Sequence, residues 1–248
     1  MSFEDSSIVI RRLDGGPSLI VQDASELAYA FFSRDPSSVG LKAYDQRAGH
    51  GDPDRITIDD VRAINQTMRA RSPHAAWEGL TSAGPLPWLA ALDPSWDLVE
   101  LPGRQWERFQ CTALLEAAFA AAIAPRRNLA VATKLLHLKQ PALFPILDAF
   151  VVESIGGLRR APVTVLLHLR AEAQRNRPAL QQVQATLQEA HVTRTLIRIL
   201  DALLWSSHPG AGIAGLTDWE RVIRPRLRAA QGTDTALGHD PTPEGLRR

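Results

Sequence analysis

Cysteine is almost absent from this chain, since Cys111 is the only one among 248 residues. A single thiol excludes an internal disulfide and a four-cysteine zinc or iron–sulfur site. Long apolar runs are missing too, because the longest alanine-rich stretch, residues 117–124, is far shorter than the roughly 18 residues of a membrane span. The acidic, polar start MSFEDSS does not resemble a secretory signal. We therefore expect a cytoplasmic protein with no membrane partner.

Neither positive nor negative residues predominate, because the formal net charge is only +1. Any surface that binds nucleic acid must then be local. The sequence holds no glycine-rich phosphate loop, no GxSxG elbow and no HExxH motif. Its seven histidines do not cluster with carboxylates at metal-ligand spacing, so we expect neither a metal site nor a cofactor.

What the chain does have is helical periodicity. Apolar spacing with proline and glycine punctuation predicts helices at residues 25–33, 56–71, 105–123, 129–139, 148–156, 162–175, 179–204 and 216–230. Ser25 is a candidate cap for the first of them. The third is the most apolar, and its alanines permit close helix packing, so we place it centrally. The fold class is mainly α, with a single multi-helix domain over residues 1–230.

The remaining segments carry strand, loop and tail signals. Two β-branched runs in residues 8–21 flank Asp14-Gly15-Gly16, which predicts a hairpin, with an ill-ordered arm over residues 1–22 as the alternative. Residues 40–54 are rich in glycine, aspartate and proline and predict a loop, and residues 93–102 predict a loop that presents Trp96. Residues 231–248 lack periodicity, so we expect a disordered tail.

The segment with the strongest functional signal is residues 124–157, APRRNLAVATKLLHLKQPALFPILDAFVVESIGG. Pro145 favours an extended backbone just before Asp148, which stands where a helix cap belongs. An aspartate in that position is usually structural, because its carboxylate accepts a backbone N–H. The alternative is a catalytic carboxylate.

Basic residues surround this aspartate. Between Arg126 and Arg160 six cations oppose two anions, a local balance of +4. The turn formed by Arg126, Arg127 and Asn128 precedes a helix N-terminus, where free backbone N–H groups can meet a phosphate. Lys134 and Lys139 would add attraction if they face the same way. A solvated surface explains the same charges.

The sequence FPILD, followed three residues later by Val151, resembles the active-site segment of helix-hairpin-helix DNA glycosylases, most closely the adenine glycosylase branch. In that superfamily an LPGVG hairpin precedes the catalytic aspartate by about twenty residues. Ala124-Pro125 falls at its Leu-Pro position, and Asp148 falls at the aspartate. Arg126 and Asn128 replace the hairpin glycines. The cysteine cluster of the adenine enzymes is missing, and Ala130 stands where lyase-type members carry lysine.

The resemblance implies a protein of DNA repair that binds double-stranded DNA and cleaves an N-glycosidic bond as a monofunctional glycosylase. Asp148 would stabilise the oxocarbenium-like state. Aromatic rings stack on bases, so the tryptophans are candidates for that contact, namely Trp77, Trp88, Trp96 and Trp106. A second acid is unassigned, with Asp59 and Asp60 as candidates that also suit a helix start.

The whole chain also resembles a bacterial family known only as a domain of unknown function, through RITIDDVRAINQTMRARS, NLAVATKLLHLKQP and ILDALLWSSHP. That resemblance implies no activity. The competing hypothesis is therefore a non-catalytic helical module that binds DNA or a protein partner, and whether the chain is an enzyme stays open.

Overall fold

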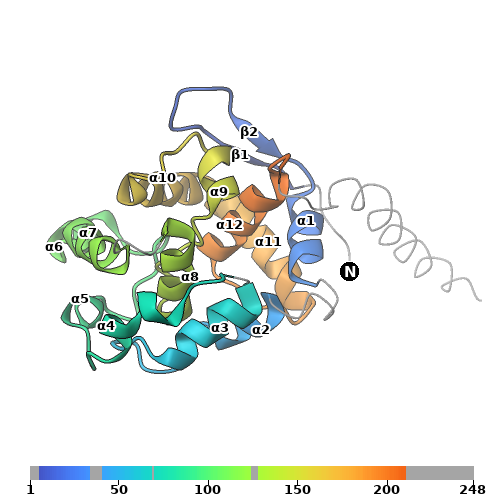
Figure 1. Ribbon diagram of the computed structural model, residues 1–248. Helices are drawn as coiled ribbons and strands as arrows, with labels where there is room; N and C mark the ends of the chain where they lie inside the picture. The colour runs from blue at the N-terminus through green and yellow to red at the C-terminus, as the bar shows by residue number, and fades with distance from the viewer. Residues whose placement is uncertain (1–5, 34–40, 69, 124–127, 211–248) are drawn as a thin grey trace, which may run out of the picture.

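The protein is mainly helical, as Figure 1 shows for a computed structural model that describes residues 6–33, 41–68, 70–123 and 128–210. A two-stranded sheet precedes the helices, and this confirms the predicted fold class. The helices of the first half are α1 (Ala24–Phe32), α2 (Leu41–Arg47), α3 (Ile58–Met68), α4 (Glu78–Thr81), α5 (Pro87–Ala90), α6 (Gly103–Arg108) and α7 (Cys111–Ala122). Those of the second half are α8 (Leu129–Lys139), α9 (Ala149–Ser154), α10 (Pro162–Arg175), α11 (Arg177–Glu189) and α12 (Leu196–Ser207).

The predicted hairpin is present. Strands β1 (Ile8–Ile10) and β2 (Leu19–Val21) pair antiparallel, with Val9 opposite Ile20. Period-two alternation buries Ile8 and Ile10 and leaves Val9 at the surface. The side chain of Asn176, after α10, both donates to and accepts from the Val9 backbone, which holds the sheet edge against the helices.

Two long helices of the prediction are each split in the structure. Residues 105–123 contain the end of α6 and all of α7, separated at Gln110, whose φ is 50°. Residues 179–204 contain most of α11 and of α12, separated near His191, whose φ is 59°. A left-handed residue ends a right-handed helix, and neither position is a glycine that would have marked the break.

Three local predictions were wrong. Ser25 does not cap α1, because Asp23 holds that position and the Ser25 hydroxyl pairs with Ser6 at 3.0 Å. The expected loop over residues 40–54 contains α2. Trp96 is not presented to solvent, since it is only 8% exposed and stacks on Phe109. The predicted helix 216–230 and the tail 231–248 lie outside the described residues.

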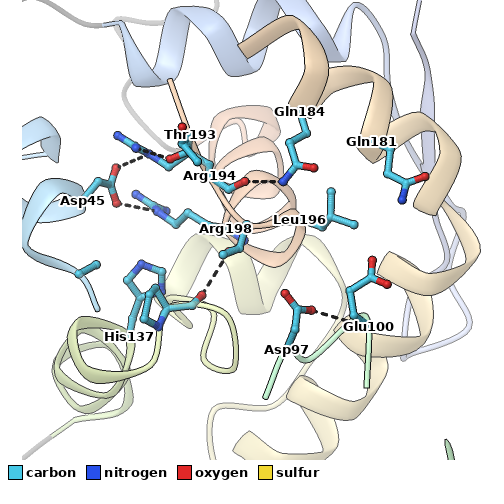
Figure 2. A pocket seen from close by; sticks show the side chains of 13 residues that line it. Asp45, Asp97, Glu100, His137, Gln181, Gln184, Thr193, Arg194, Leu196 and Arg198 are labelled. Atoms are coloured by element: carbon cyan, nitrogen blue, oxygen red, sulfur yellow. Dashed lines mark hydrogen bonds and ion pairs between the residues drawn. The ribbon is translucent and has the colours of Figure 1, made fainter. Parts of the chain in front are cut away.

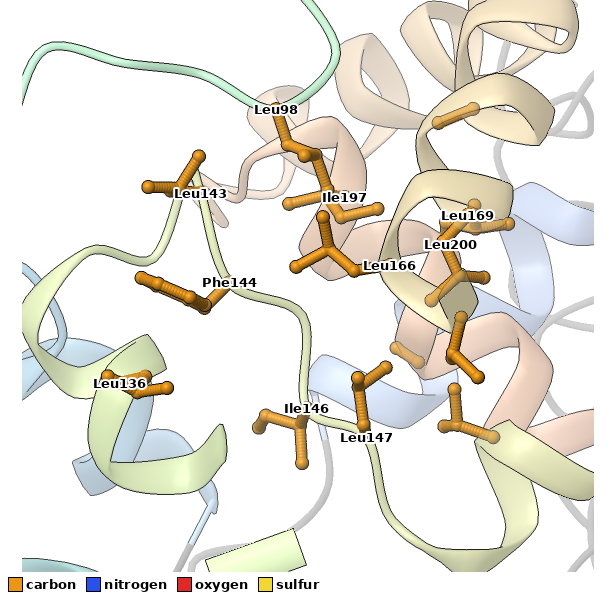
Figure 3. Packing of buried hydrophobic residues seen from close by; sticks show 14 of the residues in the cluster. Leu98, Leu136, Leu143, Phe144, Ile146, Leu147, Leu166, Leu169, Ile197 and Leu200 are labelled. Atoms are coloured by element: carbon orange, nitrogen blue, oxygen red, sulfur yellow. The ribbon is translucent and has the colours of Figure 1, made fainter. Parts of the chain in front are cut away.

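The centre of the fold is α12 rather than α7. Helix α12 packs against α1, α9, α10 and α11, and ten of its side chains are buried. Helix α7 lies at one side of the molecule in Figure 1 and buries only one face. An extended segment, residues 143–147, runs between α8 and α9 and inserts Phe144, Ile146 and Leu147 into the core (Figure 3).

Candidate functional site

Asp148 caps helix α9. Its backbone is extended and its Oδ1 accepts the Val151 N–H at 3.1 Å, so the local structure follows the capping pattern expected from the sequence. The side chain is largely buried, and this burial raises the pKa of Asp148 above its usual value. The Val151 N–H and the nearby Lys134 ammonium oppose that shift.

Three buried polar side chains fix the extended segment that leads to Asp148. Thr133 Oγ1 accepts the Leu147 N–H at 3.0 Å, and Asp201 Oδ2 accepts the Ile146 N–H at 2.8 Å. His137 Nδ1 donates to the Phe144 carbonyl at 2.6 Å. These bonds satisfy backbone groups that would otherwise be buried without partners, so the turn before α9 is held from α8 and α12 together.

The cationic residues predicted to meet DNA have varied surroundings. Arg126 and Arg127 lie outside the described residues. Asn128 caps α8 by accepting the Val131 N–H at 2.9 Å. Lys134 Nζ donates to the Met68 carbonyl at 3.2 Å, and burial lowers the pKa of Lys134. Lys139 is 2% exposed at its side chain and lies 2.5 Å from Asp60 Oδ2. Asn128, Lys134 and Lys139 thus all have intramolecular partners.

The other candidates for base recognition are mostly enclosed. Trp77 and Trp106 are buried, and their indole N–H groups donate to Ser72 and Thr112. Asp60 accepts the Thr57 N–H in the first turn of α3, which is the helix-start role. The structure brings Lys134 close to Asp148 but places Asp60 beside Lys139.

A pocket of about 370 Å³ lies elsewhere, where α2, α8, α11 and α12 meet the segment of residues 97–100 (Figure 2). Its polar lining comes from all of these elements, namely Asp45, His137, Arg194 and Arg198 on one side and Asp97, Glu100, Gln181 and Gln184 on the other. This volume falls in the range of small-molecule sites. Asp148 does not line it.

Buried ion pairs form one wall of this pocket. Arg198 Nε donates to Asp45 Oδ1 at 3.0 Å, and its Nη1 donates to Asp201. Arg194 Nε lies 3.3 Å from Asp45 Oδ2. Both guanidinium groups also lie over the Phe32 ring. Burial raises the pKa of Asp201 to about 7, although the adjacent Arg198 opposes the shift.

The ion pairs in this wall do not use every hydrogen-bonding atom of the buried charged side chains. Arg198 Nη2 is buried without a hydrogen-bond partner among the described residues, and the Arg198 side chain is 4% exposed. Among those same residues, Asp45 Oδ2 has only the ion pair with Arg194 Nε, which does not have hydrogen-bond geometry. Buried polar atoms are normally satisfied by protein, water or ligand.

His137 supplies an acceptor. Because Nδ1 donates to the Phe144 carbonyl, Nε2 of the neutral ring carries a lone pair. Burial lowers the pKa of His137 to about 4, so the ring is neutral near pH 7. The ring stacks on Tyr44 and lines the pocket, and within the described parts of the chain Nε2 has no hydrogen-bond partner.

The sequence held one overlooked signal for this pocket. Arg198 and Asp201 are charged residues three apart inside an otherwise apolar run, LIRILDALL, and buried charges need partners. Asp45 carries no such signal, because it stands in a segment whose composition predicts a loop and lies 153 residues from Arg198 in sequence.

The described ranges contain neither a candidate metal-binding cluster nor a candidate membrane-spanning helix. No group of three or more histidine, cysteine, aspartate or glutamate side chains is placed to hold a metal ion there. Among those same residues no helix is long and apolar enough to cross a membrane.

Comparison with known proteins finds one family. Residues 24–208 match the model of the Family of unknown function (DUF6308). The match begins at the first residue of α1 and ends at the residue after α12, so it includes every element of the pocket and the Asp148 turn. No curated protein and no solved structure matches the chain.

Proposed function

The chain belongs to this family of unknown function, which assigns no activity, and we propose from the geometry that it is a non-catalytic helical binding module. Its binding site is the pocket between α2, α8, α11 and α12. The partner, a small molecule or a segment of another protein, places a polar group against His137, Asp45 and Arg198.

One observation carries this proposal. His137 lines the pocket with a side chain only 1% exposed, and its Nε2 has no hydrogen-bond partner among the described residues. It lies beside Arg198, whose Nη2 is also buried without a partner in the described part of the chain. A buried acceptor without a partner costs roughly 1–3 kcal/mol, and a ligand group that donates to His137 would recover that cost. The Asp148 turn offers less to a ligand, because Asp148 Oδ1 and Asn128 Oδ1 already cap helices.

The test is fragment binding to the full chain, followed by NMR, with a variant that fills the pocket. Ala48 lines the pocket, and Ala48→Trp is expected to abolish the shifts that fragments cause at His137. Ala91→Trp is the matched control, because Ala91 is exposed at the end of α5 and does not line the pocket. Fragments that bind equally well to both variants would refute this site.

A second candidate function is a DNA glycosylase-like hydrolase acting on double-stranded DNA. Support comes from Asp148, whose pKa is raised by burial while the Lys134 ammonium lies near enough to oppose the shift. A carboxylate in such surroundings is a common feature of functional sites. Asp148 would stabilise the oxocarbenium-like state, with Arg126, Arg127 and Asn128 at a phosphate.

Base release from damaged and mismatched duplexes tests this second candidate. Asn caps helices about as well as Asp, so Asp148→Asn should fold and bind DNA normally while base release falls by about 100-fold or more. Equal release by the two proteins would remove Asp148 from the chemistry. No release by the wild type from any duplex in the screen would favour the binding module.

A further inference from the structure

The two-stranded sheet, at the top of Figure 1, is closed along one edge. On the side of β1 away from β2, the Asn176 side chain accepts the Val9 N–H at 3.2 Å and donates to the Val9 carbonyl at 2.9 Å. The Glu172 carboxylate accepts the Arg11 N–H at 3.1 Å farther along the same edge. Another strand therefore cannot pair with β1, because its outer backbone groups already have partners.

The other edge of the sheet, along β2, is open. In an antiparallel pair, two opposite residues either bond to each other or both point their N–H and C=O groups outward. Val9 bonds outward to Asn176 and stands opposite Ile20, so the backbone groups of Ile20 also point away from the neighbouring strand. Within the described residues these groups have no hydrogen-bond partner, and Ile20 is 59% exposed. The edge thus offers one unused donor and one unused acceptor.

The side chains along this edge are uncharged. Residues 17–22, PSLIVQ, contain none of the charged side chains that commonly protect a strand edge from pairing. Ile20 also stands opposite Val9 on the outer face of the sheet, where both side chains are exposed. An open edge with an exposed apolar residue at its centre favours the addition of another strand.

We propose that β2 pairs with β2 of a second copy of this chain, antiparallel and about a twofold axis at Ile20. In this register Ile20 stands opposite Ile20 of the second copy, Leu19 opposite Val21, and Ser18 opposite Gln22. Every pair joins residues of like polarity and none brings two charges together, so the edge is complementary to itself. A twofold contact of this kind is closed, because both copies use the same surface.

This contact is separate from the proposed function. The hairpin does not line the pocket between α2, α8, α11 and α12, so either idea can fail without the other. The dimer should be weak, because each copy contributes a strand of only three residues. Such a contact buries far less than the roughly 1,200 Å² of a small specific interface, and we expect a dissociation constant on the order of 100 μM.

Sedimentation equilibrium of the full chain at rising concentration tests the proposal, with Ile20→Pro as the disrupting variant. Proline lacks the outward N–H and is tolerated at a strand edge, so the pairing with β1 should remain while association is lost. Val9→Lys is the matched control, because it places a charge on the same face but in the strand whose edge is closed. It should associate like the wild type, and all three proteins should have the same far-UV circular dichroism.

Three results would overturn the inference. The first is a wild type that stays monomeric up to about 1 mM, ten times the expected dissociation constant. The second is loss of association in Val9→Lys but not in Ile20→Pro, which would mean that the copies meet through the face of the sheet. The third is slow hydrogen exchange of the Ile20 amide in the monomer, which would mean that another segment of the same chain covers the edge.

Disulfide formation tests the register without removing the edge. Residues opposite each other in a hydrogen-bonded pair have Cα atoms about 5.5 Å apart, which a disulfide can span. Ile20→Cys should therefore give a covalent dimer on mild oxidation, while the native Cys111 is buried. Ser18→Cys should not, because four strand residues, roughly 14 Å, separate the two copies of that position. Adding Gln22→Cys to it should restore the cross-link. Covalent dimers from Ser18→Cys alone, or none from Ile20→Cys, would contradict the proposed pairing.

Discussion

The Asp148 turn and the Asp45–Arg198 pocket both place carboxylates next to cations in the interior, yet they use them differently. At the turn, Asp148 accepts a backbone N–H of its own helix, and Thr133 and His137 complete the backbone bonding nearby. In the pocket, Arg198 pairs with Asp45, and its buried Nη2 still has no hydrogen-bond partner in the described part of the chain. A buried charge points to a ligand when its partners do not exhaust its hydrogen bonds.

The two regions also differ in what their charged groups contribute to stability. A helix cap contributes about 1 kcal/mol and can be supplied by Asn, Ser or Thr, so it selects weakly for aspartate. A buried ion pair costs desolvation on both partners and is seldom kept for stability. The ion-pair network of Asp45, Arg198 and Asp201, two of which line the pocket, is therefore the more informative of the two regions about function.

The largest expected loss of stability comes from a substitution in the pocket wall. Arg198→Met should destabilise the protein by about 3–5 kcal/mol, because it leaves Asp45 and Asp201 buried without their cation. Urea unfolding at pH 7 measures the change. Arg62→Met is the control, since the Arg62–Asp59 pair is exposed and contributes about 0–1 kcal/mol. Equal losses in the two variants would mean that the wall is not a tightly coupled network.

The next effect is a pH dependence set by His137. Its folded pKa of about 4 lies below the usual value of 6.5, so the stability it contributes is present above pH 6.5 and lost as pH falls through 4. The loss is about 3 kcal/mol when the shift is converted at 1.36 kcal/mol per pKa unit. An NMR titration of the His137 ring gives its pKa directly, and a value near 6.5 would contradict the burial argument.

Asp201 acts in the opposite direction over the same range. Its folded pKa of about 7 lies above the usual 3.8, so its contribution is present below pH 3.8 and lost as pH rises through 7. In the wild type, the pH dependence of stability caused by His137 and that caused by Asp201 therefore oppose each other. Asp201→Asn keeps an acceptor for the Ile146 N–H, and it should lose stability more steeply than the wild type between pH 6.5 and 4. Parallel profiles in urea unfolding would show that Asp201 does not bind a proton in this range.

A smaller effect is expected at the turn. Asp148→Ala should cost about 1 kcal/mol through the lost cap of α9, while Asp148→Asn should cost almost nothing. Asn128→Ala, which removes the equivalent cap of α8, is the reference for the size of a cap in this protein. A clear loss in Asp148→Asn would show that the charge beside Lys134, and not only the cap, stabilises the fold.

The smallest effect on stability is expected for the double variant Arg126→Ala with Arg127→Ala. If these residues contact phosphates, duplex binding should weaken steeply with salt, and the double variant should flatten the slope by about two phosphate contacts. Fluorescence anisotropy at several salt concentrations measures this. No duplex binding at low salt by the wild type would end the DNA hypothesis and leave the pocket as the site.

Local sequence patterns were sufficient for much of this fold. Helix α8 has the bounds that its periodicity predicted, Asp148 stands at the cap that Pro145 and the following apolar residues indicated, and the strand pair around Asp14-Gly15-Gly16 is present. These features depend on the propensities and hydrogen bonds of neighbouring residues. The helix breaks at Gln110 and His191 were not predicted, because a left-handed backbone at a residue other than glycine cannot be recognised from the local sequence.

The sequence by itself therefore determined the helical class and the capped turn at Asp148, which are properties of short stretches of chain. Tertiary structure alone decided which charges are buried and which meet. Asp45, His137 and Arg198 come from three helices, α2, α8 and α12, and only their packing brings a lone pair, a carboxylate and a guanidinium to one pocket. Burial then sets their pKa values and their pairing, because desolvation depends on everything packed around a group and not on its neighbours in sequence.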